Sequence, residues 1–177
     1  MGNGWGVDID HGQHNTVINN WFSNTNGPAV QLTSDGSRNF PQPCLALPNQ
    51  TASASTLVTR NTFVESNNYH LVLVNTTDSL VVDNFFGPAL RPGAISADAL
   101  TTASTAFDLG DAGPRALAWP SRNVVGGAFA GGNWYVDYLG KDTSGDGIGD
   151  TDLPYTSGGA IKGGAGDRMP LKIANSP

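Results

Sequence analysis

The sequence predicts an all-β chain that folds as a right-handed parallel β-helix of three to four coils, with inserted loops and a C-terminal capping tail. Three observations predict this fold: a residue pattern that recurs along the chain, strand-like alternation of apolar residues, and an abundance of turn-forming residues, with 23 glycines. A chain of 177 residues, 38% of them hydrophobic, is long enough for one domain with a substantial core.

The recurring pattern is an apolar β-branched residue followed five positions later by Phe, and it occurs in segments 15–22, 56–63, 79–86 and 122–129. The aligned residues are Val17, Val58, Val81 and Val124, then Phe22, Phe63, Phe86 and Phe129. The first three segments place an Asn between them, and stacked coils lie about 4.8 Å apart. We therefore expect Asn20, Asn61 and Asn84 to hydrogen-bond one another in a ladder. Gly127 takes the Asn position in the fourth segment, which predicts that the ladder ends there.

Each segment has a partner strand with apolar residues two apart, as expected for a strand with one buried face. These partners are 7–10, 30–33, 71–74 and 107–109. Val7 and Val30 are 23 residues apart, which predicts the length of one coil. Departures from this spacing predict insertions at roughly 34–54, 87–104 and 110–121. Stacked coils bury a common core, so we expect coils over 1–138, closed in the same domain by a loop and cap over 139–177.

Composition restricts the classes of partner. Glu65 is the single glutamate among 15 acidic residues, so the acidity indicates Asp-rich loops. A net charge of −6 with nine Lys and Arg argues against nucleic acid as a partner. Cys44 has no second cysteine with which to pair, and no apolar run is long enough to span a membrane. No signal-peptide pattern follows Met1, which we expect to begin a fragment of a longer protein.

The strongest local motif is residues 142–150, called the Asp loop below. Its spacing matches the order of ligands in an EF-hand-type loop, with side-chain oxygens at positions 1, 3, 5 and 9 and a backbone carbonyl at position 7. The corresponding residues are Asp142, Ser144, Asp146, Asp150 and Ile148. Leu153 stands where a complete EF-hand has Glu, and Asp152 or Asp137 would have to compensate. We expect a structural Ca²⁺ site; an Asp/Gly-rich turn without metal is the alternative.

Segment 15–22 resembles the parallel β-helix repeat of the NosD-like and pectate-lyase-like superfamily. Segments 131–138, 142–150, 154–155 and 167–171 are similar to the C-terminal end of NosD-like proteins. The resemblance implies an extracellular, periplasmic or cell-surface protein, and the family's type member is associated with periplasmic copper delivery. Copper ligands would be Cys, Met or His in a cluster, and only His11 and His14 lie close in sequence, so copper is not favoured.

Asp8, Asp10, His11 and His14 are candidate catalytic residues. Alternation in a strand at 7–10 points both carboxylates outward, where a carboxylate beside His serves as acid or base in the lyases and epimerases of this superfamily. Segment 5–8 is similar to the start of a mannuronan epimerase signature, but Ile9-Asp10 replaces the Pro-His that should follow. Solvated turn residues are the favoured alternative.

An apolar stripe is expected to point away from the core at Ile18, Trp21, Val82 and Phe85. Such a stripe is unusual on a β-helix, and we favour a roof formed by insertion 34–54 or 87–104. The alternative is an aromatic platform, with Trp21 and Phe85 binding sugar or a partner chain.

Two functions follow from these patterns. The first is a non-catalytic, Ca²⁺-stabilised β-helix module of a secreted or cell-surface protein, with polysaccharide as a candidate ligand. The alternative is a carbohydrate-active enzyme, namely a polysaccharide lyase, epimerase or hydrolase. The open first coil, near Trp5 to Asp10, also invites stacking or dimerisation through its unpaired strand edges.

Overall fold

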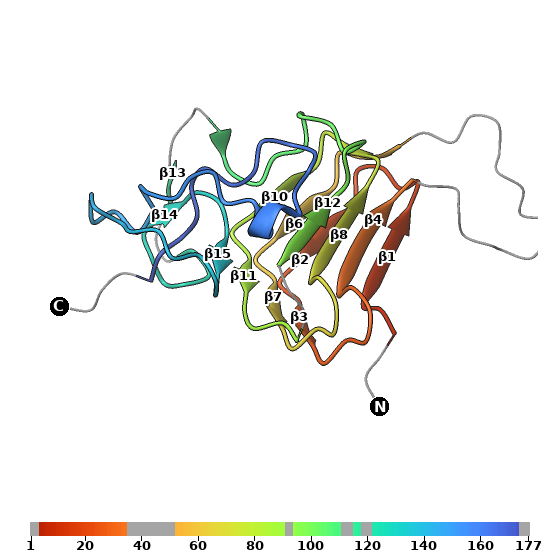
Figure 1. Cartoon of the computed structure of the whole chain (residues 1–177), viewed down its shortest axis with the longest axis horizontal. Coiled ribbons are helices and arrows are strands. Elements are labelled where there is room, and N and C mark those ends of the chain that lie inside the picture. The colour runs from red at the N-terminus through yellow and green to blue at the C-terminus, as the bar shows by residue number, and fades with distance from the viewer. Residues whose placement is uncertain (1–3, 35–51, 91–93, 111–114, 118–121, 174–177) are drawn as a thin grey trace, which may run out of the picture.

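The structure is a computed structural model of the chain, and it describes residues 4–34, 52–90, 94–110, 115–117 and 122–173. These residues form an all-β structure of stacked parallel sheets with almost no helix (Figure 1). The short 3-10 turn η2 (Ser157–Gly159) lies in the C-terminal tail. Within these ranges, no helix has the length and apolar character needed to cross a membrane. The arrangement is consistent with a β-helix and confirms the all-β expectation.

Three parallel sheets each take one strand from each of the first three passes of the chain, and the first and third sheets gain a fourth strand. The first contains β1 (Val7–Asp10), β4 (Val30–Thr33), β8 (Leu71–Val74) and β12 (Ile95–Ala97). The second contains β2 (Thr16–Ile18), β6 (Leu57–Thr59) and β10 (Leu80–Val82). The third contains β3 (Trp21–Ser23), β7 (Thr62–Val64), β11 (Phe85–Phe86) and β15 (Trp134–Tyr135).

Two smaller pairs flank these sheets. Strands β5 (Ser53–Ala54) and β9 (Thr76–Thr77) pair in parallel. Strands β13 (Arg115–Ala116) and β14 (Phe129–Ala130) pair antiparallel.

The register confirms the alignment of the first three repeats. Val7 lies opposite Val30, as the 23-residue spacing predicted. Val58 lies between Val17 and Val81 in the second sheet. Because successive strand residues point to opposite faces, this register sends every aligned Val and Phe into the same core.

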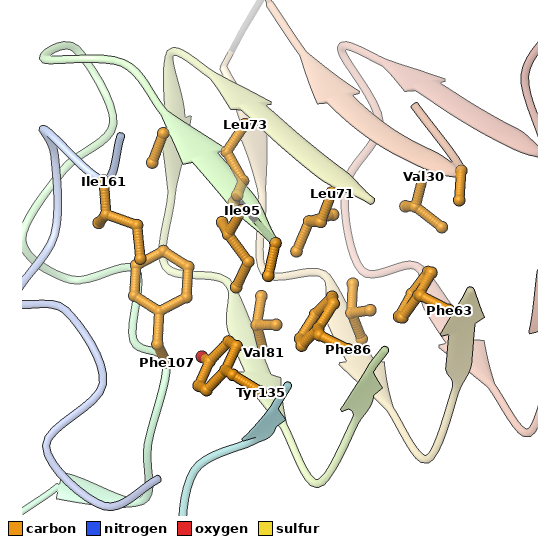
Figure 2. Close-up of a cluster of buried hydrophobic side chains, with 14 of the residues drawn as sticks. Val30, Phe63, Leu71, Leu73, Val81, Phe86, Ile95, Phe107, Tyr135 and Ile161 are labelled. Carbon is orange, nitrogen blue, oxygen red and sulfur yellow. The ribbon is translucent and has the colours of Figure 1, made fainter. Parts of the chain in front are cut away.

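Aromatic rings stack through the core in the order of the strands (Figure 2). Phe22, Phe63, Phe86 and Tyr135 have successive centroid distances of 5.1, 4.9 and 5.4 Å, and neighbouring rings lie within 8° of parallel. Tyr155 of the tail continues the stack 3.8 Å from Tyr135. The parallel register repeats one rotamer on each strand, so the rings align as a column and bury a large apolar area.

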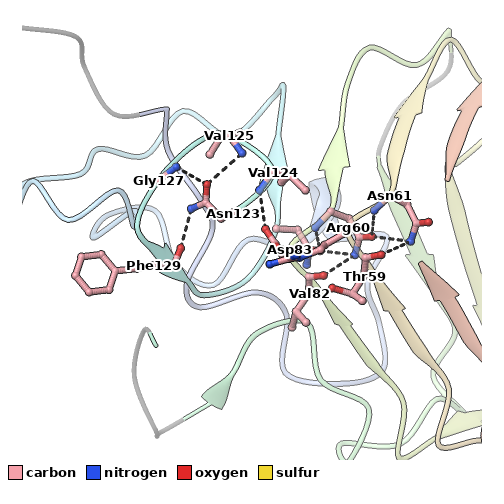
Figure 3. A network of polar contacts seen from close by, with 12 residues as sticks. Thr59, Arg60, Asn61, Val82, Asp83, Asn123, Val124, Val125, Gly127 and Phe129 are labelled. Carbon is pink, nitrogen blue, oxygen red and sulfur yellow. Dashed lines mark hydrogen bonds and ion pairs between the residues drawn. The ribbon is translucent and has the colours of Figure 1, made fainter. Parts of the chain in front are cut away.

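The expected fourth repeat at 122–129 was wrong. The strand that pairs with β11 is β15, which places Tyr135 rather than Phe129 beneath Phe86. Asn123 bends its own segment into a tight loop, in which its side chain accepts bonds from the backbone of Val125 and Gly127 and donates to Phe129 (Figure 3). This local closure competes with extension into a sheet.

The first sheet also departs from expectation. Its fourth strand is β12, which lies inside the predicted insertion 87–104, whereas residues 107–109 form no strand. Phe107 is nevertheless fully buried, because it follows Ala106, which bridges to Leu80 of the second sheet. The sequence did not reveal this strand, because its alternation, Ile95–Ser96–Ala97, is short and lies among Pro and Ala residues.

The corner between the second and third sheets consists of two residues. The first has a left-handed backbone, with φ of 58° at Asn19, 54° at Arg60 and 54° at Asp83. This conformation is unfavourable for Arg, whose side chain pairs with Asp83 at 3.2 Å (Figure 3). The second corner residue is always Asn.

These asparagines form the predicted ladder, and the ladder continues to Asn133. The backbone N and Nδ2 of Asn20 both lie 3.0 Å from Oδ1 of Asn61, and Asn61 donates to Asn84 with the same distances. Asn84 donates to Asn133 at 3.1 and 2.9 Å. The prediction that the ladder ends at Gly127 was wrong, because Asn133 is its fourth asparagine. Every step has one polarity, with donors facing the C-terminal side.

The tail closes the C-terminal side of the stack. Ile161 bridges to Ala97 of β12, and Leu171 bridges to Trp134 of β15. Asp167 ends the ladder by accepting the backbone N and Nδ2 of Asn133 at 2.7 and 3.3 Å. The strand edges and ladder donors of the last pass are therefore occupied by the chain's own tail.

Candidate functional site

The Asp loop is held by its own side chains. Asp142 accepts bonds from the backbone N of Gly145 and Gly147, at 2.6 and 2.8 Å. Asp146 accepts the backbone N of Ile148 at 2.8 Å. Asp150 reaches back to the hydroxyl and backbone N of Thr143, and these bonds lower the pKa of Asp150. Short Asp side chains close such turns because they reach nearby backbone N–H groups.

The donor chemistry of this loop suits Ca²⁺, since every predicted ligand atom is a hard oxygen. The carboxylates are instead bound to the loop backbone, and across the described ranges no three His, Cys, Asp or Glu side chains gather around one point. Ser144 donates to Asp142 at 3.3 Å, so these two predicted ligands do meet. Binding of a cation would require the loop to rearrange around it.

The candidate catalytic residues lie at the first strand and the turn after it. Asp8 and Asp10 are exposed on β1 and Ile9 is partly buried, as the alternation predicted. The structure brings Asp10 and His11 together, with His11 Nδ1 and Asp10 Oδ1 2.7 Å apart. His11 and His14 both have a left-handed backbone, with φ of 54° and 55°, and the backbone N of His14 donates to the carbonyl of Ala54.

The outer face of the third sheet carries a row of side chains in register, formed by Trp21, Thr62, Phe85 and Trp134; we call it the aromatic row. Trp21 is 70% exposed, and Phe85 and Trp134 stack at 4.2 Å with rings 10° from parallel. The row therefore offers an open aromatic surface at Trp21 and a paired aromatic surface two strands away.

The apolar stripe is covered unevenly. Ile18 is 44% exposed, whereas Val82 is buried and so does not point into solvent as expected. Insertion 87–104 supplies β12 to the first sheet rather than a roof over this face. Most of the other expected roof, residues 35–51, lies outside the described residues.

Two adjoining hollows beside the tail, which the sequence did not predict, have volumes of about 460 and 500 Å³ and share Asp137 and Gly158. Asp137 accepts the Tyr155 hydroxyl at 2.8 Å, and burial raises the pKa of Tyr155. Tyr69 and Lys162 line the first hollow. Asp137 and Tyr155 fall within the end motifs already noted in the sequence, but only folding brings them together.

A buried Ser–His contact was also missed. Ser66 and Nδ1 of His70 are 2.8 Å apart, and Nε2 of His70 lies 3.0 Å from the carbonyl of Gly87. Burial lowers the pKa of His70, and both side chains are fully inaccessible. Because no substrate reaches this pair, it satisfies polar atoms inside the core. A lone His immediately before a buried strand was the signal available in the sequence.

Asp167 is the third group that the sequence did not reveal. It is fully buried, and its Oδ2 also accepts the Tyr135 hydroxyl at 2.9 Å. Burial raises the pKa of Asp167 to about 7, and the bonds from Asn133, Met169 and Tyr135 oppose that rise. Its position at the end of the ladder makes it a structural cap.

Comparison with known proteins adds no relative to this chain. No family model, no curated protein and no solved structure matches it.

Proposed function

We propose that this chain is a non-catalytic module of a secreted or cell-surface protein, which binds an extended polysaccharide through the aromatic row. Its architecture in this proposal is a right-handed, NosD-like β-helix of three to four coils. Parallel passes in register and the repeated Asn corner support the architecture.

The observation that carries the binding proposal is the exposure of Trp21 at the end of the aromatic row. Exposed aromatic side chains on a rigid sheet mark interaction surfaces, because leaving them in water is unfavourable. The row runs perpendicular to the strands and has steps of about 4.8 Å, so it places aromatic side chains along a line rather than at one point. A linear sugar polymer suits such a surface, since its rings alternate apolar faces with hydroxyl groups.

The test is binding of a panel of neutral and acidic polysaccharides by calorimetry, for the unaltered chain and for Trp21→Ala. Leu139→Ala is the matched control, because Leu139 is 85% exposed and lies in the tail. We expect Trp21→Ala alone to weaken binding at least tenfold. Unchanged binding by Trp21→Ala, or no binding to any polysaccharide, would refute the proposal.

We further propose that Ca²⁺ stabilises the Asp loop. Its support is the spacing of Asp142, Asp146 and Asp150 around Gly147, which keeps three hard-oxygen side chains within one short loop. A cation that binds the folded state alone raises the melting temperature through linkage. Thermal unfolding with EDTA and then with Ca²⁺ should show that rise for the unaltered chain and for Asp78→Asn, but not for Asp146→Asn. No rise in any variant would remove Ca²⁺ from the proposal.

The enzyme alternative depends on the Asp10–His11 contact, which places a carboxylate beside an imidazole on an outer surface. The same polysaccharides, incubated with the chain, would then yield new reducing ends, unsaturated sugars or epimerised units. Product that disappears in Asp10→Asn would replace the binding proposal with a catalytic one.

A further inference from the structure

The N-terminal end of the stack, formed by β1, β2 and β3, is open on one side; we call it the end face. Among the described residues, each of these strands pairs with a single neighbour, β4, β6 and β7 respectively. Figure 1 shows β1 and β3 at the outer limit of their sheets. A parallel strand edge carries backbone N–H and C=O groups that are positioned for another strand.

The apolar core is also incomplete at the end face. Val7, Ile9 and Phe22 are partly buried, whereas their partners on the next pass, Val30, Leu32 and Phe63, are fully buried. One more parallel pass would bury these three side chains to the same degree.

The Asn ladder gives the end face a direction. Each Asn accepts, at Oδ1, two N–H bonds from the Asn before it, as Asn61 does from Asn20. Asn20 uses its own Nδ2 to bond Ile18 and Asn61, and among the described residues no donor lies on its Oδ1. The end face therefore presents an acceptor that matches an incoming backbone N–H and amide Nδ2.

We propose that the end face binds a parallel β-coil from a partner polypeptide, a coil that presents an Asn whose backbone N and Nδ2 are free to donate. This inference is independent of polysaccharide binding, which uses the outer face of the third sheet. The complementary chemistry is backbone pairing along three strands, an apolar face over Phe22, and an amide donor over Asn20.

Ladder polarity argues against a second copy of this chain. Two end faces brought together would oppose one Asn20 Oδ1 with another, and two acceptors do not bond. At the opposite end of the stack, Asp167 already accepts the N and Nδ2 of Asn133. At its C-terminal end, the described part of a copy therefore offers no free Asn donors that continue the ladder.

The chain itself provides a probe in the correct register. Segments 7–22 and 71–86 have the same length, and in both an apolar residue is followed by Val after ten residues and by Phe after five more. A peptide with the sequence of residues 71–86, carrying terminal lysines for solubility, would place Asn84 over Asn20 and Phe86 over Phe22. Inside the chain, Asn84 already donates its N and Nδ2 in this way.

The experiment measures binding of this peptide to the full chain by calorimetry, with amide hydrogen exchange locating the protected strands. We expect binding that protects β1, β2 and β3 and that weakens at least tenfold when the peptide carries Asn84→Ala. Equal binding of both peptides would overturn the amide-directed proposal, as would an absence of binding. Concentration-dependent self-association that protects the same strands without peptide would overturn it in favour of a second copy.

Discussion

Asn61 is the most informative position at which to test the ladder, because its side chain is fully buried and uses all of its hydrogen-bonding groups. Its Nδ2 donates to the carbonyls of Val17 and Thr59, at 2.8 and 2.9 Å, and to Asn84. Its Oδ1 accepts two bonds from Asn20. One side chain therefore connects three consecutive passes of the chain.

Asn61→Ala removes these bonds and leaves buried backbone groups without partners. A typical bond contributes about 1 kcal/mol, and a buried group left unpaired costs about 1–3 kcal/mol. Water has little access to the carbonyl of Val17 once the amide is gone, so we expect the free energy of unfolding to fall by about 4 kcal/mol.

Asn20→Ala is the matched control, because Asn20 is the same residue at the exposed end of the same ladder. Its Nδ2 bonds the exposed Ile18 carbonyl and the Oδ1 of Asn61, and Asn61 Oδ1 still accepts the backbone N of residue 20 in the variant, so we expect a loss of about 1 kcal/mol. Urea unfolding followed by circular dichroism measures both values. Equal losses for the two variants would refute the claim that the buried ladder stabilises the stack.

Three further predictions concern buried groups near the core. The pKa of Asp167 is about 7 in the folded chain and 3.8 ordinarily, so the free energy of unfolding should fall by up to roughly 4 kcal/mol as the pH rises from about 4 to about 7. Denaturation curves measured across that range should show a smaller dependence on pH for Asp167→Asn. Burial lowers the pKa of His70, so its titration followed by NMR should have a midpoint below 6.5. The free energy of unfolding should decrease as the pH falls below about 6.5, because the unfolded chain then binds a proton at this His more readily than the folded chain does. A midpoint at or above 6.5 would contradict the burial of His70. Gly132→Ala should destabilise the chain by about 3 kcal/mol in urea, because the added methyl collides with the Asp167 carboxylate, whereas Gly126→Ala, at an open position with positive φ, should lose about 1 kcal/mol.

The accuracy of the sequence predictions depended on how local each signal was. The first three repeats carry Val, Asn and Phe at fixed spacing, and each residue has the same role in the structure. The fourth pass was misplaced because 122–129 copies the pattern while Asn123 closes a local loop. The fourth asparagine of the ladder is Asn133, whose segment has Tyr135 in place of Phe and Ala130 in place of Val.

Sites assembled from distant segments could not be predicted. The contact between Asp137 and Tyr155 and the Asp167 cap on Asn133 both join residues that share no local pattern. By contrast, the turns of the Asp loop form within nine residues, and their Asp and Gly spacing was visible directly.

The sequence by itself determined the strand period, the length of a pass and, in the first three repeats, the Val and Phe that face inward, because backbone alternation and side-chain polarity act over a few residues. Only the tertiary structure decided which segment forms the fourth pass and which side chains lose their water. It also decided that the Asn ladder has an occupied end at Asp167 and an open end at Asn20. Those outcomes depend on stacking between passes, where a residue's partner is set by the register of the whole pass rather than by its neighbours in the chain.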